Sequence, residues 1–180
     1  MKEVMKTLLA FQDGYIKRDV TNIETFVNRV FVDADDTMII GTGDGEWCRG
    51  LEQIRELVNI DWTYWGNFKL DLDKMIIKSF GNFATVSTTA VLQKEYEPGK
   101  LNEYNINRMK RILDSDSTDK EKIYLALKGM SYYLHEDNVG EDVKRKVRFS
   151  GTLLDEQGVW KFTDIHFSYP VSPPTDIKVI

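Results

Sequence analysis

The chain has 180 residues, of which 42% are hydrophobic and 29% are charged, with a formal net charge of −5 and a pI near 5.1. This composition is typical of one soluble domain that buries a core of its own, and an acidic surface disfavours nucleic acids and anionic membranes as partners. No apolar run approaches the roughly 18 residues of a membrane span. Cys48 is the only cysteine, so no intramolecular disulfide is possible. Because the first residues also lack the pattern of a signal peptide, we expect a cytoplasmic protein.

The first segment has apolar residues at helical spacing from Val4 to Ile16, which predicts an amphipathic helix. Residues 21–24, Thr-Asn-Ile-Glu, fit a capping box, in which the hydroxyl and the carboxylate satisfy free amide groups at a helix start. A second, shorter helix is therefore predicted to begin there.

The next segment predicts a strand, a loop and a third helix. Residues 37–40 favour β structure and stop at the glycine-rich residues 41–45, which we expect to begin a loop that includes Trp47 and reaches Gly50. Apolar residues from Leu51 to Trp65 then recur at helical spacing, and Gly66 ends that helix.

Two hairpins are predicted downstream. Residues 69–79 and 82–94 flank a turn at 80–82, and residues 142–154 and 159–168 are joined at Gln157 and Gly158. The first of these four strands is irregular around Asp73, which suggests a bulge.

Residues 95–141, between the hairpins, are too long for a simple connection. Ile106, Met109 and Leu113 indicate one helix, and a stripe at Ile123, Leu127, Met130 and Leu134 indicates a second. A capping box at residues 118–121 precedes the second helix. The tail, residues 170–180, holds three of the four prolines and is expected to be an extended arm.

This order of segments resembles the nuclear transport factor 2-like superfamily and, within it, the SnoaL-like proteins, which include polyketide cyclases and relatives of ketosteroid isomerase. The resemblance rests on the opening helix pair, on residues 36–41 and 46–54, and on residues 160–168. It covers about residues 3–94 and 142–169, so the helical segment 95–141 is an insertion.

The resemblance implies one α+β domain over residues 1–180. In this cone, a curved antiparallel sheet wraps around the N-terminal helices and leaves a pocket, with the helical insertion between the two hairpins. It also implies a homodimer formed through the face of the sheet.

The last predicted strand suggests a catalytic pair. Strict alternation places Trp160, Phe162, Asp164, His166 and Ser168 on one face, so that an aromatic wall ends in ionisable groups. An imidazole exchanges protons near neutral pH, and a carboxylate on the same face can orient it. His166 and Asp164 are therefore the candidate acid and base, and the alternative is that His166 only forms a hydrogen bond within the strand.

Candidate ligand-binding residues line the same expected pocket. They are Tyr15, Trp47, Trp62, Trp65, Phe162 and Ser168. Tyr15 can donate a hydrogen bond to a carbonyl from the first helix, whereas aromatic side chains at helical spacing can equally be core.

Other motifs fail in their spacing. Residues 41–46 lack the glycines of a dinucleotide site and the lysine of a phosphate loop, residues 114–119 lack the glycine of a calcium loop, and His135 has no partner histidine. We therefore expect neither a cofactor nor a metal.

Two hypotheses about function remain. One is a SnoaL-like protein with an apolar pocket for a small apolar or carbonyl-bearing molecule, in which catalysis is unassigned and a cofactor-independent isomerase, cyclase or dehydratase is possible. The other is a non-catalytic homodimeric interaction module that uses the helical insertion or the C-terminal tail.

Overall fold

A computed structural model describes residues 2–43, 45–134, 137–139 and 141–169. The chain divides into two compact units, residues 1–92 with 146–180, and residues 93–145. The second unit encloses the predicted insertion 95–141, and its boundaries fall inside the two strands β5 (Phe83–Glu95) and β7 (Asp142–Glu156). The predicted tail, residues 170–180, lies outside the described residues.

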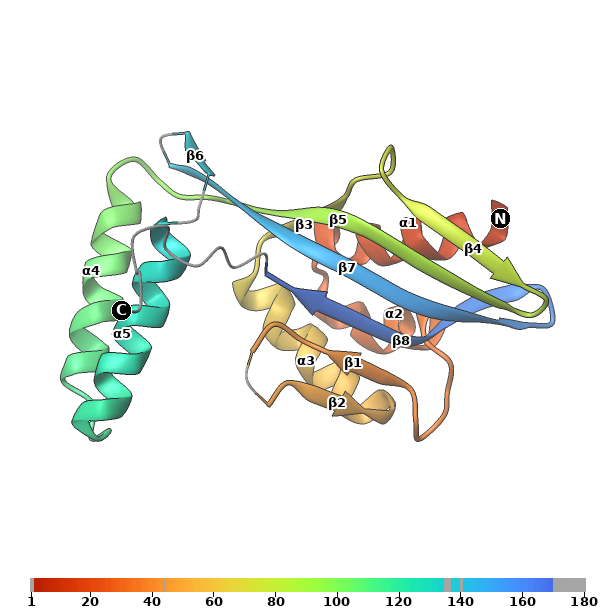
Figure 1. Cartoon of the computed structure of the whole chain (residues 1–180), viewed down its shortest axis with the longest axis horizontal. Coiled ribbons are helices and arrows are strands. Elements are labelled where there is room, and N and C mark those ends of the chain that lie inside the picture. Colours follow the sequence, from red (N-terminus) through yellow and green to blue (C-terminus); the bar gives the residue numbers. More distant parts are fainter. Residues whose placement is uncertain (1, 44, 135–136, 140, 170–180) are drawn as a thin grey trace, which may run out of the picture. The chain divides into compact units, whose positions relative to one another are not determined.

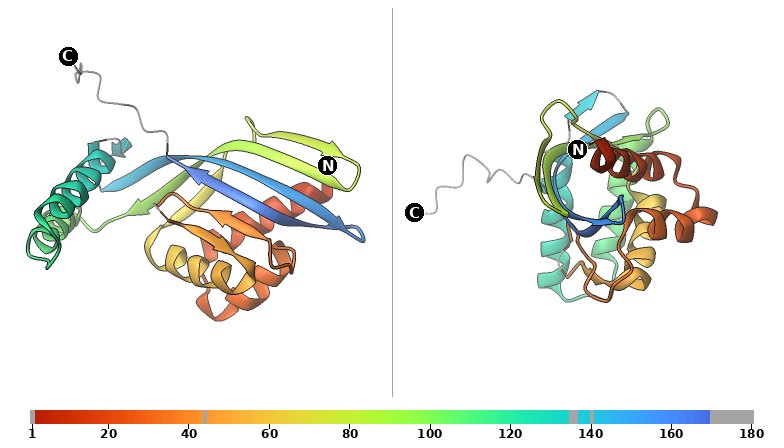
Figure 2. Two further views of the ribbon diagram at one scale, coloured as in Figure 1. Left: turned by 60° about the horizontal axis from the view of Figure 1, so that its bottom comes forward. Right: turned by 90° about the vertical axis from the view of Figure 1, so that its right-hand side faces the viewer.

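The first unit contains the three predicted N-terminal helices, α1 (Lys2–Lys17), α2 (Ile23–Val30) and α3 (Gly50–Tyr64). The strands of the sheet in this unit are β1 (Met38–Ile40), β2 (Trp47–Arg49), β3 (Asn67–Leu70), β4 (Ile76–Phe80), β5 (Phe83–Glu95), β7 (Asp142–Glu156) and β8 (Val159–Ser168). The helices lie on the concave side of a strongly curled sheet (Figures 1 and 2). The predicted α+β architecture is therefore confirmed.

The strand order is β2-β1-β8-β7-β5-β3, and β4 also pairs with β5. Both predicted hairpins are present, as β4 with β5 and β7 with β8, and both pairs are antiparallel. β1 runs parallel to β8, so the early strand extends the sheet beyond the second hairpin.

The core of the first unit is aromatic. Val4, Leu8, Phe11 and Tyr15 form one fully buried stripe along α1, as their spacing predicts. Phe11 packs against rings from the sheet and from α2, including Phe149 at 5.8 Å between ring centroids. The inner face of the cone is therefore filled largely by side chains of the protein itself.

The second unit is a helical pair. α4 (Lys100–Leu113) and α5 (Asp119–Leu134) follow each other closely, and the short strand β6 (Asp137–Val139) pairs with β7. The predicted capping box is present: the backbone N–H of Thr118 donates to Glu121 Oε2 at 2.8 Å, and the N–H of Glu121 donates to Thr118 Oγ1 at 3.4 Å. In the predicted stripe of α5, Ile123 and Leu127 are exposed, and the side chains of Met130 and Leu134 lie outside the described residues.

Three local expectations were wrong. The capping box at residues 21–24 does not form, because Asp19 accepts the hydrogen bond from the N–H of Thr21 and a short 3₁₀ turn, Val20–Asn22, precedes α2. Residues 47–49 form β2 and not part of a loop. The first strand of the first hairpin is divided into β3 and β4, since the chain turns at residues 71–75.

Strand β8 also departs from the predicted alternation. Asp164 pairs with Thr152 while Phe162 pairs with Leu153, so Thr163 is an extra residue in a β-bulge. Beyond the bulge, Ile165 and Phe167 are buried and His166 is exposed. The expectation that Phe162 and His166 share one face was therefore wrong.

Candidate functional site

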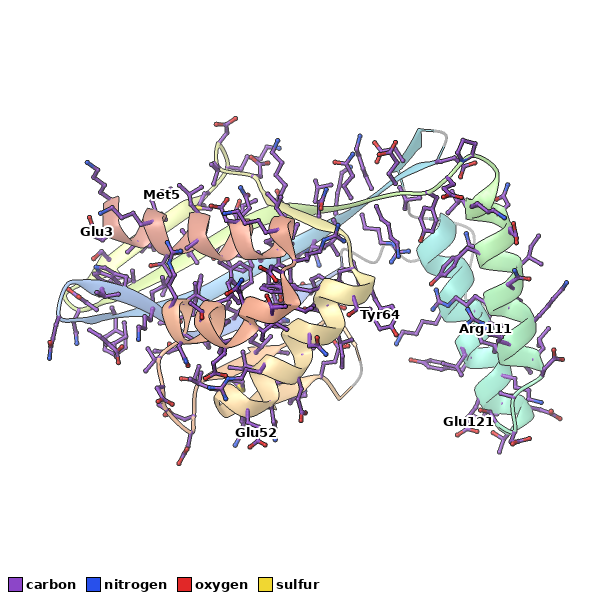
Figure 3. The ribbon with its side chains drawn as sticks, turned by 180° about the vertical axis from the view of Figure 1, so that it is seen from behind. Glu3, Met5, Glu52, Tyr64, Arg111 and Glu121 are labelled. Atoms are coloured by element: carbon purple, nitrogen blue, oxygen red, sulfur yellow. The ribbon has the colours of Figure 1, made fainter. Side chains whose placement is uncertain are left out.

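Helices α1 and α3 bring two ionisable side chains together inside the core. The Oη of Tyr15 donates a hydrogen bond of 2.9 Å to Oδ2 of Asp61. Tyr15 has no exposed surface and Asp61 is 3% exposed. Asp61 precedes Tyr64 by three residues, and Tyr64 marks the C-terminal end of α3 in Figure 3.

Aromatic rings surround this pair. The Tyr15 ring lies 4.7 Å from Phe11 and 5.7 Å from Phe68, measured between centroids. Trp62 and Trp65 lie 6.3 Å and 6.2 Å from it. The surroundings are therefore apolar and polarisable, and they exclude water from the pair.

Burial changes the acidity of both groups. Burial raises the pKa of Asp61 to about 7; the hydrogen bond from Tyr15 works against this rise, and the charge of Glu46 adds to it. Burial, followed by the charge of Asp61, raises the pKa of Tyr15 well above its ordinary value. Tyr15 therefore stays protonated at neutral pH, while Asp61 is divided between its acid and its base form.

The β1–β2 connection supplies further polar groups. Glu46 Oε2 accepts a hydrogen bond of 2.6 Å from the N–H of Gly43, which holds its carboxylate inside the turn. Cys48, on β2, packs against the core, and burial raises the pKa of its thiol, with smaller effects from the charges of Glu46 and Asp61. This side of the pair is therefore acidic.

A further polar atom is buried beside the pair. The indole Nε1 of Trp62 is shielded from solvent and has no hydrogen-bond partner in the part of the chain that the structure describes. An unpaired buried donor is uncommon and is one mark of a functional region. Together these groups form a small polar cluster within an apolar core.

No family model matches this sequence, and no curated protein matches it either. Solved structures do match. A candidate dehydratase of the NTF2-like family from Streptomyces avermitilis has a TM-score of 0.62 at 14% identity, over 95% of this chain and 96% of that chain.

This chain has the nuclear transport factor 2-like fold.

A protein with a cystatin-like fold from Caulobacter vibrioides is also similar in structure, with a TM-score of 0.55 at 12% identity over 96% of this chain and 89% of that one. A candidate scytalone dehydratase from Novosphingobium aromaticivorans has a TM-score of 0.55 at 8% identity, over 93% and 81% of the two chains. At these identities the similarity shows the fold alone.

Within this NTF2-like cone, the predicted ligand-binding residues separate into two groups. Tyr15, Trp62, Trp65 and Phe162 all belong to the core or pack against it. Trp47 is 59% exposed, and Ser168 is half-buried at the end of β8. The structure brings together the helix-borne aromatics but not Trp47.

The predicted catalytic pair is not gathered around Tyr15. His166 is exposed beside Ser150 on β7, and half-buried Asp164 is two residues nearer the bulge. Thr163 donates a hydrogen bond of 3.2 Å to Oδ2 of Asp164. A catalytic role for His166 and Asp164 stays a prediction.

Asp61 was missed by sequence reasoning although the sequence carries a signal. It lies three residues after Val58 and four before Trp65, so it occupies the apolar stripe of α3. A carboxylate in such a stripe is either partnered or functional. This periodicity marks Asp61 as an inward-facing carboxyl group that needs a partner, and the structure identifies that partner as Tyr15.

Two further kinds of feature are absent from the described residues. No group of three or more histidine, cysteine, aspartate or glutamate side chains there is arranged to hold a metal ion. Across the same residues, no helix combines the length and the hydropathy needed to cross a bilayer.

Proposed function

We propose that this protein binds a small, largely apolar molecule with a carbonyl group and catalyses proton transfer beside that carbonyl without a cofactor. The observation that carries the proposal is the buried hydrogen bond between Tyr15 and Asp61, in which the Asp61 pKa is about 7. A group that titrates near the working pH can both accept and return a proton, which is the requirement for general acid–base catalysis.

The two side chains have different roles. Tyr15, which stays protonated, donates a hydrogen bond to the carbonyl oxygen of the ligand and stabilises the negative charge that develops there. Ionised Asp61 removes a proton from the carbon next to the carbonyl, which leaves an enolate and a protonated Asp61. Return of that proton to another carbon gives isomerisation, and its delivery to a departing hydroxyl group gives dehydration with release of water.

Access to the pair requires movement of a side chain, because Tyr15 has no exposed surface. Trp65 is partly buried, contacts Tyr15, and rests edge-on against Phe167 at 5.5 Å. Gly66, with φ of 108°, follows it and ends α3. We assign Trp65 as the side chain that moves aside to admit a ligand.

Two observations favour dehydration or isomerisation over simple binding. Carboxyl groups whose pKa is raised towards neutral pH are concentrated at catalytic sites, and the pKa of Asp61 is raised to about 7. In addition, candidate dehydratases occur among proteins of this fold, at 14% and 8% identity.

The experiment uses the full chain and 1-tetralone, an apolar cyclic ketone, as the first probe of a panel. Deuterium incorporation next to the carbonyl is followed by NMR in D₂O. We expect wild-type protein to accelerate exchange, Tyr15→Phe and Asp61→Asn to lose about a hundredfold or more of that acceleration, and His166→Ala to retain it. The exchange rate of the wild type should rise with pH and level off above about pH 7.

Retention of full exchange activity in Asp61→Asn would remove Asp61 from the mechanism. Loss in His166→Ala alone would return the assignment to His166 and Asp164. Trp65→Ala should speed ligand entry, and slower entry in that variant would contradict the access route.

We also propose a homodimer formed through the sheet. Strand β4 supports this proposal, since Ile76 and Phe80, four residues apart on one side of the strand, are 59% and 64% exposed. Sedimentation velocity at micromolar concentration should give twice the mass of the chain, and a monomer would contradict the proposal.

A further inference from the structure

The second unit contains a cavity that is separate from the Tyr15–Asp61 pair. Its volume is about 430 Å³, within the range of roughly 300–1,000 Å³ typical of small-molecule sites. The described lining residues are Asn102, Asn105, Ile106, Arg108, Met109 and Ile112 of α4, with Gly129 of α5. Most of this lining is apolar, so the cavity suits a ligand with an apolar body.

Two hydrogen-bond donors stand on one side of the cavity. Asn105 and Arg108 are three residues apart on α4, which places them on the same face of the helix. The Nδ2 of Asn105 is shielded from solvent and has no hydrogen-bond partner within the described ranges. For Arg108, no salt bridge occurs with any residue that the structure describes.

These donors select the charge of the ligand. A guanidinium group offers paired N–H donors that match the two oxygens of a carboxylate, and a neighbouring amide N–H can donate a further hydrogen bond. Met109 and Ile112 continue the same side of α4 for the next turn and present apolar surface. A ligand that fits this arrangement has an anionic group beside Arg108 and an apolar chain along Met109 and Ile112.

The glycine at position 129 leaves space in the cavity beside Arg108. Glycine is less favourable than alanine inside a helix, so its presence in the interior of α5 needs a reason. A Cβ at this position would lie 3.8 Å from Cζ of Arg108, which is an ordinary van der Waals contact. Packing therefore does not require glycine, whereas an added methyl group would occupy space beside the guanidinium.

We infer that the α4–α5 cavity is a second ligand site, which binds a medium-chain carboxylate through Arg108 and Asn105. The site shares no residue with the Tyr15–Asp61 pair, so it stands independently of the proposed catalytic function.

Calorimetric titration of the full chain with sodium octanoate tests the site, and 1-octanol serves as the uncharged comparison. We expect saturable binding of one octanoate per chain. The affinity for octanol should be lower than that for octanoate by about tenfold or more. Arg108→Gln should weaken octanoate by about tenfold or more and leave octanol unchanged, since it removes the charge and the paired N–H donors of the guanidinium but keeps a polar amide. Gly129→Ala should keep or increase the helical circular dichroism signal and weaken both ligands.

Three results would overturn the inference. They are non-saturable uptake of octanoate, equal octanoate affinity in wild type and Arg108→Gln, and loss of octanoate binding in Asp61→Asn but not in Arg108→Gln. The last result would place the octanoate in the cone. Unchanged octanoate affinity in Asp61→Asn supports two separate sites.

Discussion

The buried carboxyl group of Asp61 should make the stability of the protein depend on pH between about 4 and 7. The native pKa of about 7 stands above the ordinary value of 3.8. The native state therefore holds the proton more tightly than the unfolded chain does. Consequently, the stabilising contribution of Asp61 is complete below the unfolded pKa and is lost as the pH rises through the native pKa.

The magnitude follows from the difference between the two pKa values. Each pKa unit corresponds to about 1.4 kcal/mol, so a rise of roughly three units corresponds to about 4 kcal/mol. Asp61 is 3% exposed, which limits screening by solvent. Because the unfolding free energy of a domain is only about 5–15 kcal/mol, this loss is large enough to measure.

The test compares wild type with Asp61→Asn in urea denaturation followed by tryptophan fluorescence at several values between pH 4.5 and 8. Asparagine cannot titrate but can still accept the hydrogen bond from Tyr15. The unfolding free energy of Asp61→Asn, relative to wild type, should therefore increase with pH by about 3–4 kcal/mol and then level off.

Asp142→Asn provides a matched control. Hydrogen bonds from Lys144 and then Gln93 lower the pKa of half-buried Asp142, so its contribution is lost only as the pH falls through the acid range. The difference between this variant and wild type should stay constant from pH 5 to 8. A constant difference for Asp61→Asn over the same interval would refute the reasoning, because it would mean that burial does not raise the pKa of Asp61.

Two further substitutions test the packing of each unit. Gly14→Ala adds a methyl group that overlaps the ring of Phe26, so unfolding free energy should fall by about 1–3 kcal/mol despite the better helix propensity of alanine; a variant as stable as wild type in urea would contradict this packing. Thr118→Ala removes the hydroxyl of the capping box at the start of α5 and should cost about 1 kcal/mol, seen as faster amide exchange in the first turn. Glu121→Gln keeps a hydrogen-bond acceptor and should change that exchange little, so equal effects of the two substitutions would argue against the cap.

Local sequence patterns predicted the elements that depend on near neighbours. The stripe from Val4 to Tyr15 required only a helix with one apolar side. The turn at Gln157 and Gly158, where both residues have positive φ, joined two β-favouring runs as expected. The capping box at Thr118 also formed, since both of its partners lie within one turn of helix.

The same kind of pattern failed where another hydrogen-bond acceptor competed or where a second strand decided the pairing. At Thr21, the nearby Asp19 took the hydrogen bond that the capping box would have used. Strand β2 is short and follows a glycine-rich loop, so its pairing with β1 leaves little local signal. Alternation in β8 failed at Thr163, because a bulge is a property of two paired strands and not of one.

For the candidate site, the sequence by itself determined that Tyr15 faces inward and that Asp61 occupies an apolar stripe. Each statement depends only on the 3.6-residue period of one helix. Only the tertiary structure decided that the two meet, that burial brings the Asp61 pKa to about 7, and that His166 lies outside. The physical reason is that hydrogen bonding and desolvation depend on distances between elements that are 46 residues apart in the chain.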